Sequence, residues 1–349
     1  MNVLMVGVDK NRLGGMWSVA EIFLNNKVYN DEVELTYVAT STCGSIAKRL
    51  CVMLVGYFKI IFFLFIKKIE IVHIHMAEKG SVFRKGIVVY LAKFFNKKVL
   101  IQMHAGPFMD WFNSLSPQKK LFVKKILNKS DLVLVLGQYW KNQLKSIVVH
   151  SKIDVLYNGS YLPAPRKYNN KGKFILFLGM ISEKKGVYDL LEAIKRVDYR
   201  LDSDIKVLLC GEDVSRVIEK KILNLGLSKR VKYAGWISNE KKEELFSNAQ
   251  LCVLPSYSEA LSMTVIEAMC HGIPIITTNI TTMPELIGNI IELVEPGDIK
   301  ALADLILFYS THEEERSYVS KLLYSRALEH FSDCKCIYDT LHYYDKLLS

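Results

Sequence analysis

The sequence predicts an α/β protein with two doubly wound parallel domains in tandem. Short β-branched runs alternate with helical stretches from the first residue onward, which is the pattern of βα units on a parallel sheet. The pattern stops at residues 161–173, a segment with two prolines, a glycine and no hydrophobic period, and then restarts. A chain of 349 residues is also too long for one ordinary core. We therefore expect a first domain over residues 1–165 and a second over 166–349, with the last helices either staying in the second domain or packing back on the first.

The strands follow from short apolar runs bounded by polar residues, with helices between them. In the first half we expect strands at residues 2–8, 32–39, 70–76, 98–104, 131–136 and 152–157. In the second half we expect them at 174–180, 205–211, 231–236, 251–255 and 273–277, then a turn, a short strand and a mainly helical tail. In doubly wound sheets ligands bind beyond the carboxyl ends of the strands. The loops that follow the strands are therefore expected to face a cleft between the domains.

The charge of the chain favours an anionic partner. Lys and Arg number 46 against 36 Asp and Glu, a net charge of +10, which suits nucleic acid, an acidic lipid surface or a phosphorylated ligand. An arginine-rich tail, an aromatic-interleaved RNA signature and zinc-finger spacing are missing from the sequence, so we expect no nucleic acid partner. Seven scattered cysteines fit a reducing cytoplasm. The first residues predict a strand and do not show the basic and then apolar pattern of a secretory signal, so we expect none.

One stretch, "CVMLVGYFKIIFFLFIKK" at residues 51–68, is apolar enough to contact a bilayer. About 16 apolar-dominated residues are interrupted by Lys59, which is short of the ~18–20 expected of a spanning helix. A half-buried domain helix is the first prediction, a monotopic membrane contact is the second, and a spanning segment is the least favoured. We therefore expect a cytoplasmic protein, either free or peripheral on the inner face of the cytoplasmic membrane.

Two loops carry residues that suit a phosphorylated ligand. Gly14 and Gly15 follow the first strand without the full G-x-G-x-x-G fingerprint, so a nicotinamide enzyme is disfavoured. A glycine pair at a helix start either lets backbone N–H groups approach a phosphate or only makes a tight turn. Lys184 and Lys185 precede Gly186 at another helix start, where a lysine and the helix dipole both attract a diphosphate. The alternative for this second loop is a solvated lysine pair.

Two glutamates flank a third helix start. Ser262 is expected to cap a helix that runs to about His271, so its first amides form an anion site, at Leu261, Ser262, Met263 and Thr264. Glu259 precedes these amides and suits neutral hydroxyls, and Glu267 lies deeper, where a carboxylate can accept two hydrogen bonds from a vicinal diol. Two surface glutamates are the alternative interpretation.

The segment "VLPSYSEALSMTVIEAMCHGIPIITTNITTMPELI" resembles the donor-site signature of the retaining family-4 glycosyltransferases, the glycosyl transferases group 1. Supporting pieces stand in the family's order: the glycine pair, "EIVHIHM", "VLIQMHAG", "VLYNGS", "SEKKGVYDLLEAI" and "VKYAGWIS". The resemblance covers residues 2 to 310 and implies the GT-B fold, in which two Rossmann-like domains face each other across a cleft. The first domain would bind the acceptor and the second the sugar nucleotide.

The resemblance also implies residue roles. Glu259 would contact the donor sugar and Glu267 the ribose, Lys185 the diphosphate, Gly15 the phosphate or acceptor, and His104 would lie beside the reacting carbon. Glu259 and His104 are thus the expected catalytic residues.

The chain departs from the family pattern at one cation. Met180 stands where the family has an arginine, and Arg84 is the candidate substitute, with Gly14 a further phosphate or acceptor contact. A surface arginine is the alternative for Arg84. Because a helix N-terminus plus a lysine can replace a divalent cation, we expect neither a metal nor a cofactor.

The expected reaction moves a sugar, with retention, from a nucleotide-diphosphate sugar to a saccharide or lipid-linked acceptor. The preferred process is assembly of a bacterial capsule, exopolysaccharide or lipopolysaccharide. The alternatives are a sugar-nucleotide epimerase or phosphorylase of the same fold, and a non-catalytic member that binds nucleotide sugars.

Overall fold

The computed structural model describes residues 1–11, 14–104, 106–149, 151–163, 168–172 and 174–349. The chain divides into two compact units. Unit 1 comprises Met1–Gly159 and Asp333–Ser349, and unit 2 comprises Ser160–Ser332. The division falls before the expected boundary at residue 165, which lies outside the described residues. The segment Asp333–Ser349 belongs to unit 1, which is the second of the two alternatives given for the last helices.

Unit 1 is built on a sheet of six parallel strands in the order β2-β1-β3-β4-β5-β6. Each strand lies within one of the runs expected from the sequence, usually one to three residues shorter. Their bounds are β1 (Asn2–Gly7), β2 (Glu34–Ala39), β3 (Ile71–Met76), β4 (Lys98–Met103), β5 (Leu132–Val135) and β6 (Lys152–Val155). The β1 and β3 side chains are almost all buried, as expected for a sheet covered on both faces.

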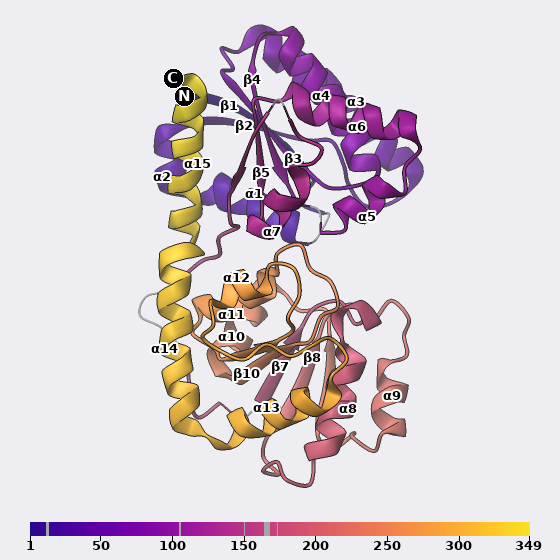
Figure 1. Cartoon of the computed structure of the whole chain (residues 1–349), viewed down its shortest axis with the longest axis vertical. Helices are drawn as coiled ribbons and strands as arrows, with labels where there is room; N and C mark the ends of the chain where they lie inside the picture. Colours follow the sequence, from indigo (N-terminus) through magenta and orange to yellow (C-terminus); the bar gives the residue numbers. More distant parts are fainter. Residues whose placement is uncertain (12–13, 105, 150, 164–167, 173) are drawn as a thin grey trace. The chain divides into compact units, whose positions relative to one another are not determined.

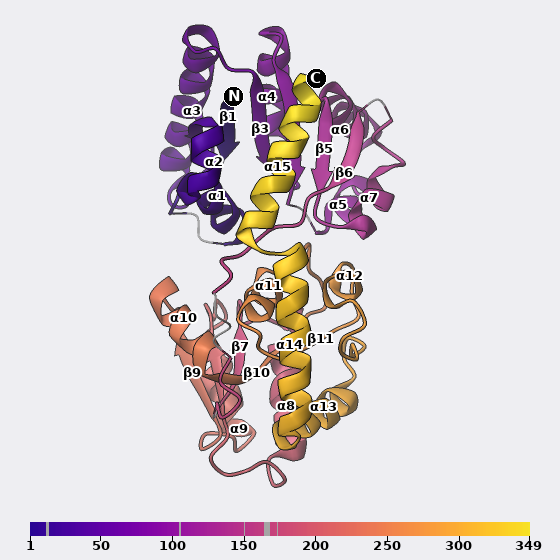
Figure 2. The same cartoon turned by 90° about the vertical axis from the view of Figure 1, so that its left-hand side faces the viewer.

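Helices cover both faces of this sheet. Their bounds are α1 (Gly15–Asn25), α2 (Lys27–Glu32), α3 (Ile46–Ile66), α4 (Gly80–Phe94), α5 (Phe108–Asn113), α6 (Pro117–Lys129), α7 (Gln138–Leu144) and α15 (Asp333–Leu348). The chain steps one way from β1 to β2 and the other way from β2 to β3, so right-handed crossovers place helices on opposite faces. Within unit 1, α2 and α15 lie on one face of the sheet, and α3, α4 and α6 lie on the other (Figures 1 and 2).

The last helix is held in unit 1 by buried polar contacts. The Tyr344 hydroxyl of α15 lies 3.0 Å from the Tyr29 hydroxyl of α2 and 2.6 Å from His73 Nδ1 on β3. Both tyrosines and the histidine are fully buried. Because a buried polar group without a partner is costly, these bonds fix α15 on the sheet of unit 1.

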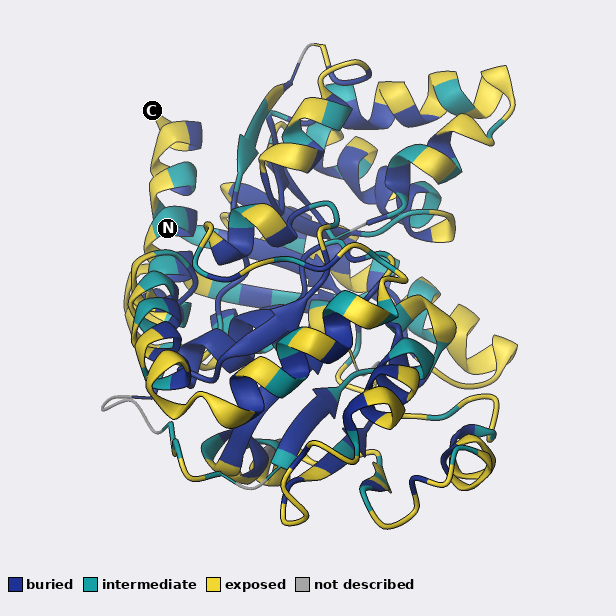
Figure 3. Cartoon of the chain, turned by 60° about the horizontal axis from the view of Figure 1, so that its bottom comes forward, coloured by how far each residue is buried: buried dark blue, intermediate teal, exposed yellow. Residues whose placement is uncertain are grey.

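Unit 2 contains a sheet of five parallel strands in the order β11-β10-β7-β8-β9. Their bounds are β7 (Phe174–Leu178), β8 (Lys206–Cys210), β9 (Val231–Gly235), β10 (Ala249–Leu254) and β11 (Ile275–Thr277). The short strand expected after residue 277 is wrong, because that segment contains a short helix and only an isolated bridge between Thr278 and Val294. The central strands of the two sheets are mostly dark blue in Figure 3, whereas the edge strands β2, β6 and β9 are partly exposed and most helices expose an outer face.

The helices of unit 2 also follow the expected alternation. Their bounds are α8 (Val187–Val197), α9 (Ile218–Asn224), α10 (Asn239–Asn248), α11 (Met263–Cys270), α12 (Met283–Ile287), α13 (Ile299–Thr311) and α14 (Glu313–His330), with a 3-10 turn, η1 (Glu183–Lys185), before α8. The structure therefore confirms the two doubly wound sheets predicted from the sequence.

The strand orders locate the point in each sheet where ligands bind in doubly wound folds. Chain direction across the sheet reverses between β1 and β3 in unit 1 and between β7 and β10 in unit 2. Ligands of such sheets bind beyond the carboxyl ends of the strands at this switch point. The loops that follow these four strands are therefore the first places to look for a site.

Candidate functional site

In unit 2 the loop after β7 is held against the loop after β10. Gly186 has φ of 68°, and a Cβ there would lie 1.9 Å from the Pro255 carbonyl oxygen, so only glycine fits. The Tyr257 backbone N–H donates to the Lys184 carbonyl at 2.9 Å. These contacts place Lys185, which ends η1, beside the residues that follow β10.

Lys185 and Glu259 form an ion pair at the switch point of unit 2. The Lys185 Nζ lies 2.5 Å from Glu259 Oε1, and the Ser256 hydroxyl donates to the same oxygen at 2.8 Å. The Glu259 side chain is only 9% exposed, whereas Lys185 is 26% exposed. The Thr281 hydroxyl donates to the Glu259 carbonyl at 2.9 Å. The carboxylate is therefore held in one place, and the ammonium is accessible to solvent.

Helix α11 begins beside this pair. Ser262 is its N-cap, as expected, and its hydroxyl oxygen accepts from the Val265 N–H. The Thr264 hydroxyl donates to the Leu178 carbonyl at the end of β7, at 3.0 Å, which joins the helix start to the switch point. Leu261 is buried and Met263 is half-buried. The four residues expected at an anion site thus lie at the first turn of a helix, next to Lys185.

Glu267 has a partner that the sequence did not indicate. Lys242 of α10 lies with its Nζ 2.6 Å from Glu267 Oε1, and both side chains are largely buried. His271 accompanies them, with Nδ1 2.8 Å from the Glu267 carbonyl and Nε2 2.9 Å from Glu243 Oε2. The sequence analysis missed Lys242 because one lysine in a charged helix has no distinctive spacing. The available signal was its position in the helix that follows the carboxyl end of β9. A ligand of Glu267 must share the carboxylate with this ammonium.

In unit 1, the expected residues follow the switch-point strands. Gly14 has φ of 130°, which favours glycine, and it caps α1, whose first residue is Gly15. Both glycines are exposed. Arg84 lies on the second turn of α4, after β3, and its backbone carbonyl accepts from the Tyr57 hydroxyl at 3.0 Å. Backbone amides at α1 and a guanidinium at α4 thus occupy the same edge of this sheet.

His104 follows β4 and ends a column of three histidines. The rings of His73 and His75 stack with centroids 4.7 Å apart, and those of His75 and His104 stack at 5.1 Å. Burial lowers the pKa of His73 and of His104 to about 3, and that of His75 falls well below its usual value for the same reason. The Lys85 ammonium, which donates to the His75 carbonyl, further lowers the pKa of His75 and His104. All three imidazoles are therefore neutral at pH 7.

Sequence reasoning also passed over one Asp-x-Asp triplet, Asp202-Ser203-Asp204, a spacing that can bind a divalent cation. The triplet precedes β8 and therefore lies at the amino edge of the sheet, the edge opposite Lys185 and Glu259. The Asp204 N–H donates to Asp202 Oδ1 at 2.9 Å, which makes the segment a local turn. Within the described residues, no group of three His, Cys, Asp or Glu side chains is arranged to hold a metal ion.

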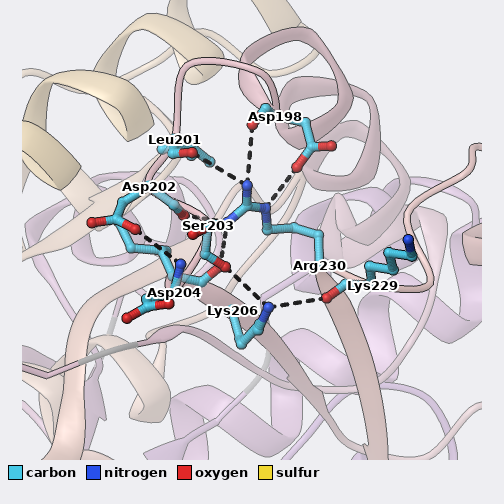
Figure 4. Close-up of polar contacts among 9 residues, drawn as sticks. Asp198, Leu201, Asp202, Ser203, Asp204, Lys206, Lys229 and Arg230 are labelled. Atoms are coloured by element: carbon cyan, nitrogen blue, oxygen red, sulfur yellow. Dashed lines mark hydrogen bonds and ion pairs between the residues drawn. The ribbon is translucent and has the colours of Figure 1, made fainter.

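The same edge is occupied by a structural arginine (Figure 4). Arg230 Nε donates to Asp198 Oδ1 at 2.6 Å, and Nη1 donates at 2.5 Å to both the Asp202 and the Ile205 carbonyls. Nη2 donates to the Asp198 and Leu201 carbonyls. This guanidinium joins the end of α8 to the starts of β8 and β9, so this edge serves stability and the opposite edge carries the candidate site.

Comparison with known proteins places this geometry in a family. Residues 162–325 match the family model of glycosyl transferases group 1. An uncharacterized 41.2 kDa protein in the cps region of Klebsiella pneumoniae is 25% identical over 64% of this chain and 63% of its own length. The O-antigen chain mannosyltransferase B of Escherichia coli is 26% identical over 42% of this chain and 39% of its own. The chain thus spans less than two thirds of these relatives.

Solved structures share the whole fold. Sucrose-phosphate synthase from Thermosynechococcus elongatus has a TM-score of 0.79 at 17% identity, covering 99% of each chain. Anabaena HepE in complex with UDP and glucose has a TM-score of 0.76 at 14% identity, covering 99% of this chain and all of that one. The matched family model covers nearly all of unit 2, including Lys185, Glu259 and Glu267. Residues 162–325, nearly all of unit 2, thus belong to the glycosyl transferases group 1 family, and the chain has the GT-B fold.

Proposed function

We propose that the chain is a retaining glycosyltransferase that takes its sugar from a nucleotide-diphosphate sugar. The observation that carries the proposal is the Lys185–Glu259 pair beside the first turn of α11, at the switch point of unit 2. It combines a cation and helix amides, which suit a diphosphate, with a fixed carboxylate, which suits sugar hydroxyls. The structure of Anabaena HepE in complex with UDP and glucose supports a donor of this class.

In this mechanism the protein stabilises the departing diphosphate. Lys185 and the amides of α11 are already in place for the developing negative charge, so little reorganisation accompanies bond cleavage. Glu259 accepts hydrogen bonds from the donor sugar, and the neutral His104 offers a nitrogen to the reacting end of the substrate. Retention without a protein nucleophile requires departure and attack on the same face, with the leaving phosphate taking the acceptor's proton. These groups supply the charge stabilisation without a metal ion.

For the acceptor, we propose a saccharide or lipid-linked intermediate of a bacterial surface polysaccharide. The similarity to a capsule-region protein and to an O-antigen mannosyltransferase supports this process. The exposed, amide-lined start of α1 and Arg84 are the groups of unit 1 that would meet the acceptor or the phosphates.

Two single-residue variants test the site. In the ligand-free pair Glu259 holds the ammonium that a diphosphate needs, so donor binding must compete with Glu259 for Lys185. Glu259→Gln should therefore keep or tighten UDP, GDP or dTDP binding while lowering transfer tenfold to hundredfold, the range of roughly 1.5–3 kcal/mol for a hydrogen bond to a charged group. Lys185→Met should weaken nucleoside-diphosphate binding by a similar factor. Calorimetry on each variant gives the binding constants.

A panel of sugar nucleotides tests the reaction itself. Slow hydrolysis of one donor, with the anomeric configuration retained in the sugar released at first, is the expected result. A free epimer or a sugar phosphate as product would favour an epimerase or phosphorylase, and binding without any turnover would favour a non-catalytic member. If Lys185→Met binds nucleotides as tightly as wild type, Lys185 does not hold the diphosphate, and the proposal is contradicted.

A further inference from the structure

Three helices of unit 1 carry the net positive charge of the whole chain. Helices α3, α4 and α6 contain eleven Lys and Arg residues and no Asp or Glu. The rest of the sequence has 35 of the 46 basic residues and all 36 acidic ones, so its charges nearly cancel. The three helices lie side by side on one face of the sheet, with α4 in contact with both of the others (Figure 1). We refer to α3, α4 and α6 as the acid-free layer.

Most of these charges face solvent. Seven of the eleven basic side chains are exposed: Lys48, Arg49 and Lys59 of α3, and Lys119, Lys124, Lys125 and Lys129 of α6. Lys85 is buried beneath α4, and Lys93 pairs with Asp131 at 2.5 Å. The outer surface of the layer therefore presents a positive field that no carboxylate of its own helices neutralises.

The same layer exposes an unusual share of apolar surface. Of the 29 large apolar side chains that are exposed among the described residues, 14 lie on these three helices, which hold 49 of the 349 residues. They are Ile46, Leu50, Leu54, Val55, Phe58, Ile61, Phe62, Phe65 and Ile66 of α3, Ile87, Tyr90 and Phe94 of α4, and Leu121 and Phe122 of α6. These side chains gather on three neighbouring helices, and exposed apolar residues gathered in this way mark an interaction surface.

The expectation that the stretch at residues 51–68 is too short to span a bilayer was wrong, because α3 begins before it, at Ile46, and has 21 residues. Among the described helices, α3 alone is long and apolar enough to cross a bilayer. The packing of α3 instead favours a helix that lies on the sheet of unit 1 and does not span a membrane. Gly56, Ile60 and Leu64 form a buried stripe at four-residue spacing, and a Cβ at Gly56 would lie 2.6 Å from the Ala39 carbonyl of β2. The helix is therefore packed closely on the sheet, and Phe58, Phe62 and Phe65 project from its opposite side.

Lysine and aromatic side chains of α4 and α6 lie beside one another. The Lys129 ammonium of α6 lies 5.9 Å from the centre of the Tyr90 ring of α4. The Phe83 ring of α4 stacks on Phe122 of α6, with centroids 6.1 Å apart. Aromatic rings beside lysines suit a membrane interface, where the rings enter the headgroup region and the ammonium groups meet lipid phosphates.

We infer that the acid-free layer is a docking surface for an anionic lipid membrane, on which unit 1 lies without crossing it. Such an apolar face could be covered by a lipid membrane or by a second copy of the chain, and charge favours the membrane. A second copy would bring two such positive faces together, which like-charge repulsion opposes, whereas anionic headgroups complement the lysines. The inference concerns α3, α4 and α6 only. Its test is therefore independent of the test of the proposed sugar transfer.

Co-sedimentation of the intact chain with vesicles tests this inference without any sugar substrate. Wild-type protein should pellet with vesicles of phosphatidylglycerol and phosphatidylcholine, bind pure phosphatidylcholine poorly, and be released in part as salt rises. Failure to pellet with the anionic vesicles at low salt would overturn it. Retention of the protein by the vesicles after alkaline carbonate washing would also overturn it, because α3 would then span the bilayer.

A charge variant measures the electrostatic part. Replacing the exposed Lys119, Lys124 and Lys125 of α6 with glutamine should weaken binding to anionic vesicles roughly a hundredfold, at about fivefold per lysine. The matched control replaces three exposed lysines of unit 2 with glutamine: Lys220, Lys232 and Lys300. Equal losses in the two triple variants would contradict a specific surface, because net charge alone would then account for binding.

An apolar variant measures insertion. Serine at Phe58, Phe62 and Phe65, which are 57–80% exposed, should remove the binding that survives high salt. The control replaces exposed apolar residues of unit 2: Tyr199, Val214 and Leu223. If the phenylalanine variant is folded by circular dichroism and keeps salt-resistant binding, the inference is wrong. If wild type is a dimer in solution and this variant is a monomer, a second copy covers the face and the inference is also wrong. Should the variant fail to fold, the charge variant still decides.

Discussion

His75 Nδ1 lies 2.9 Å from His104 Nε2, and the two rings stack with centroids 5.1 Å apart. Because both imidazoles are kept neutral by burial, one nitrogen of this pair must donate and the other must accept. The tautomer of His104 is therefore coupled to that of His75, one strand away. A residue in the core of unit 1 thus sets whether the other nitrogen of His104, Nδ1, donates or accepts a hydrogen bond.

The first prediction concerns this pair. His75→Phe keeps a ring in the stack but removes the partner of His104 Nε2, so the orientation and tautomer of His104 should no longer be fixed. We expect kcat for sugar transfer to fall about tenfold or more, since a positioned proton-transfer or hydrogen-bonding group contributes at least that much. Nucleoside-diphosphate affinity, which depends on unit 2, should not change.

Steady-state kinetics and calorimetry on the same preparation separate the two effects. His75→Asn, whose amide can replace one hydrogen bond, should recover part of the rate. Equal kcat in wild type and His75→Phe would mean that His75 only fills space.

The second prediction is a loss of stability in acid. His73 has a pKa of about 3 in the folded state because it is buried, against 6.5 for the free side chain. Between these values the unfolded chain binds a proton and the folded chain does not, so the free energy of unfolding falls as pH drops below about 6.5. One such histidine costs about 2 kcal/mol near pH 5. His75 and His104 act in the same direction.

Urea unfolding as a function of pH measures this effect. The groups around His73 are Tyr344 of α15, Gln102 of β4 and the neighbouring His75, none of which supplies a negative charge at neutral pH. His73→Gln can keep the hydrogen bonds but cannot titrate, so its stability should depend less steeply on pH. His342→Gln, at an exposed position of α15, is the control and should leave the slope unchanged. A steeper slope in His73→Gln would contradict the assignment.

The third prediction separates Glu267 from Lys242. Glu267→Ala removes the carboxylate and should weaken donor binding tenfold to hundredfold if it holds the ribose diol, the range of roughly 1.5–3 kcal/mol. Lys242→Gln leaves the carboxylate but removes the ammonium that lies 2.6 Å from it, so donor binding should be kept or tightened. Titration of each variant with UDP and with free phosphate distinguishes ribose from phosphate contacts. Donor binding lost in Lys242→Gln and kept in Glu267→Ala would reverse the two roles.

The fourth prediction concerns the edge of unit 2 away from the site. Arg230→Met removes five hydrogen bonds to Asp198 and to four backbone carbonyls, and should lower the free energy of unfolding by about 2–4 kcal/mol. Nucleotide affinity of the folded variant should equal that of wild type. Chemical unfolding and calorimetry check the two statements, and a loss of affinity at full stability would contradict a purely structural role.

Most of the fold could be predicted because each strand is a short apolar run in the sequence. The alternation of these runs with helices is the pattern of a parallel sheet. The N-cap Ser262 was likewise correct, since capping depends on neighbouring residues. The partners of the two glutamates could not be predicted in this way. Lys242 and Glu267 are 25 residues apart and meet only because β9 and β10 both end at one edge of the sheet.

The histidine column was missed for the same reason. His75 and His104 lie on neighbouring strands, and the register that sets Gln102 opposite His75 is a property of the folded sheet. The return of α15 to unit 1 was left open because its amphipathic pattern fits either sheet. Only the buried contact of Tyr344 with His73 decides it. Sequence patterns therefore predict elements and caps well, and long-range pairs poorly.

The return of α15 to unit 1 also fixes an order of events during synthesis. Unit 2 is complete once residue 332 has been made, but unit 1 lacks α15 until residues 333–349 have followed. Domains generally fold as units while translation proceeds, so the inserted unit is free to fold before the unit that encloses it in sequence. Until α15 arrives, His73 and Tyr29 lack the Tyr344 hydroxyl, and the face of the sheet that it covers stays open to water or to chaperones. Unit 1 thus completes its fold only after all of unit 2 has been synthesised.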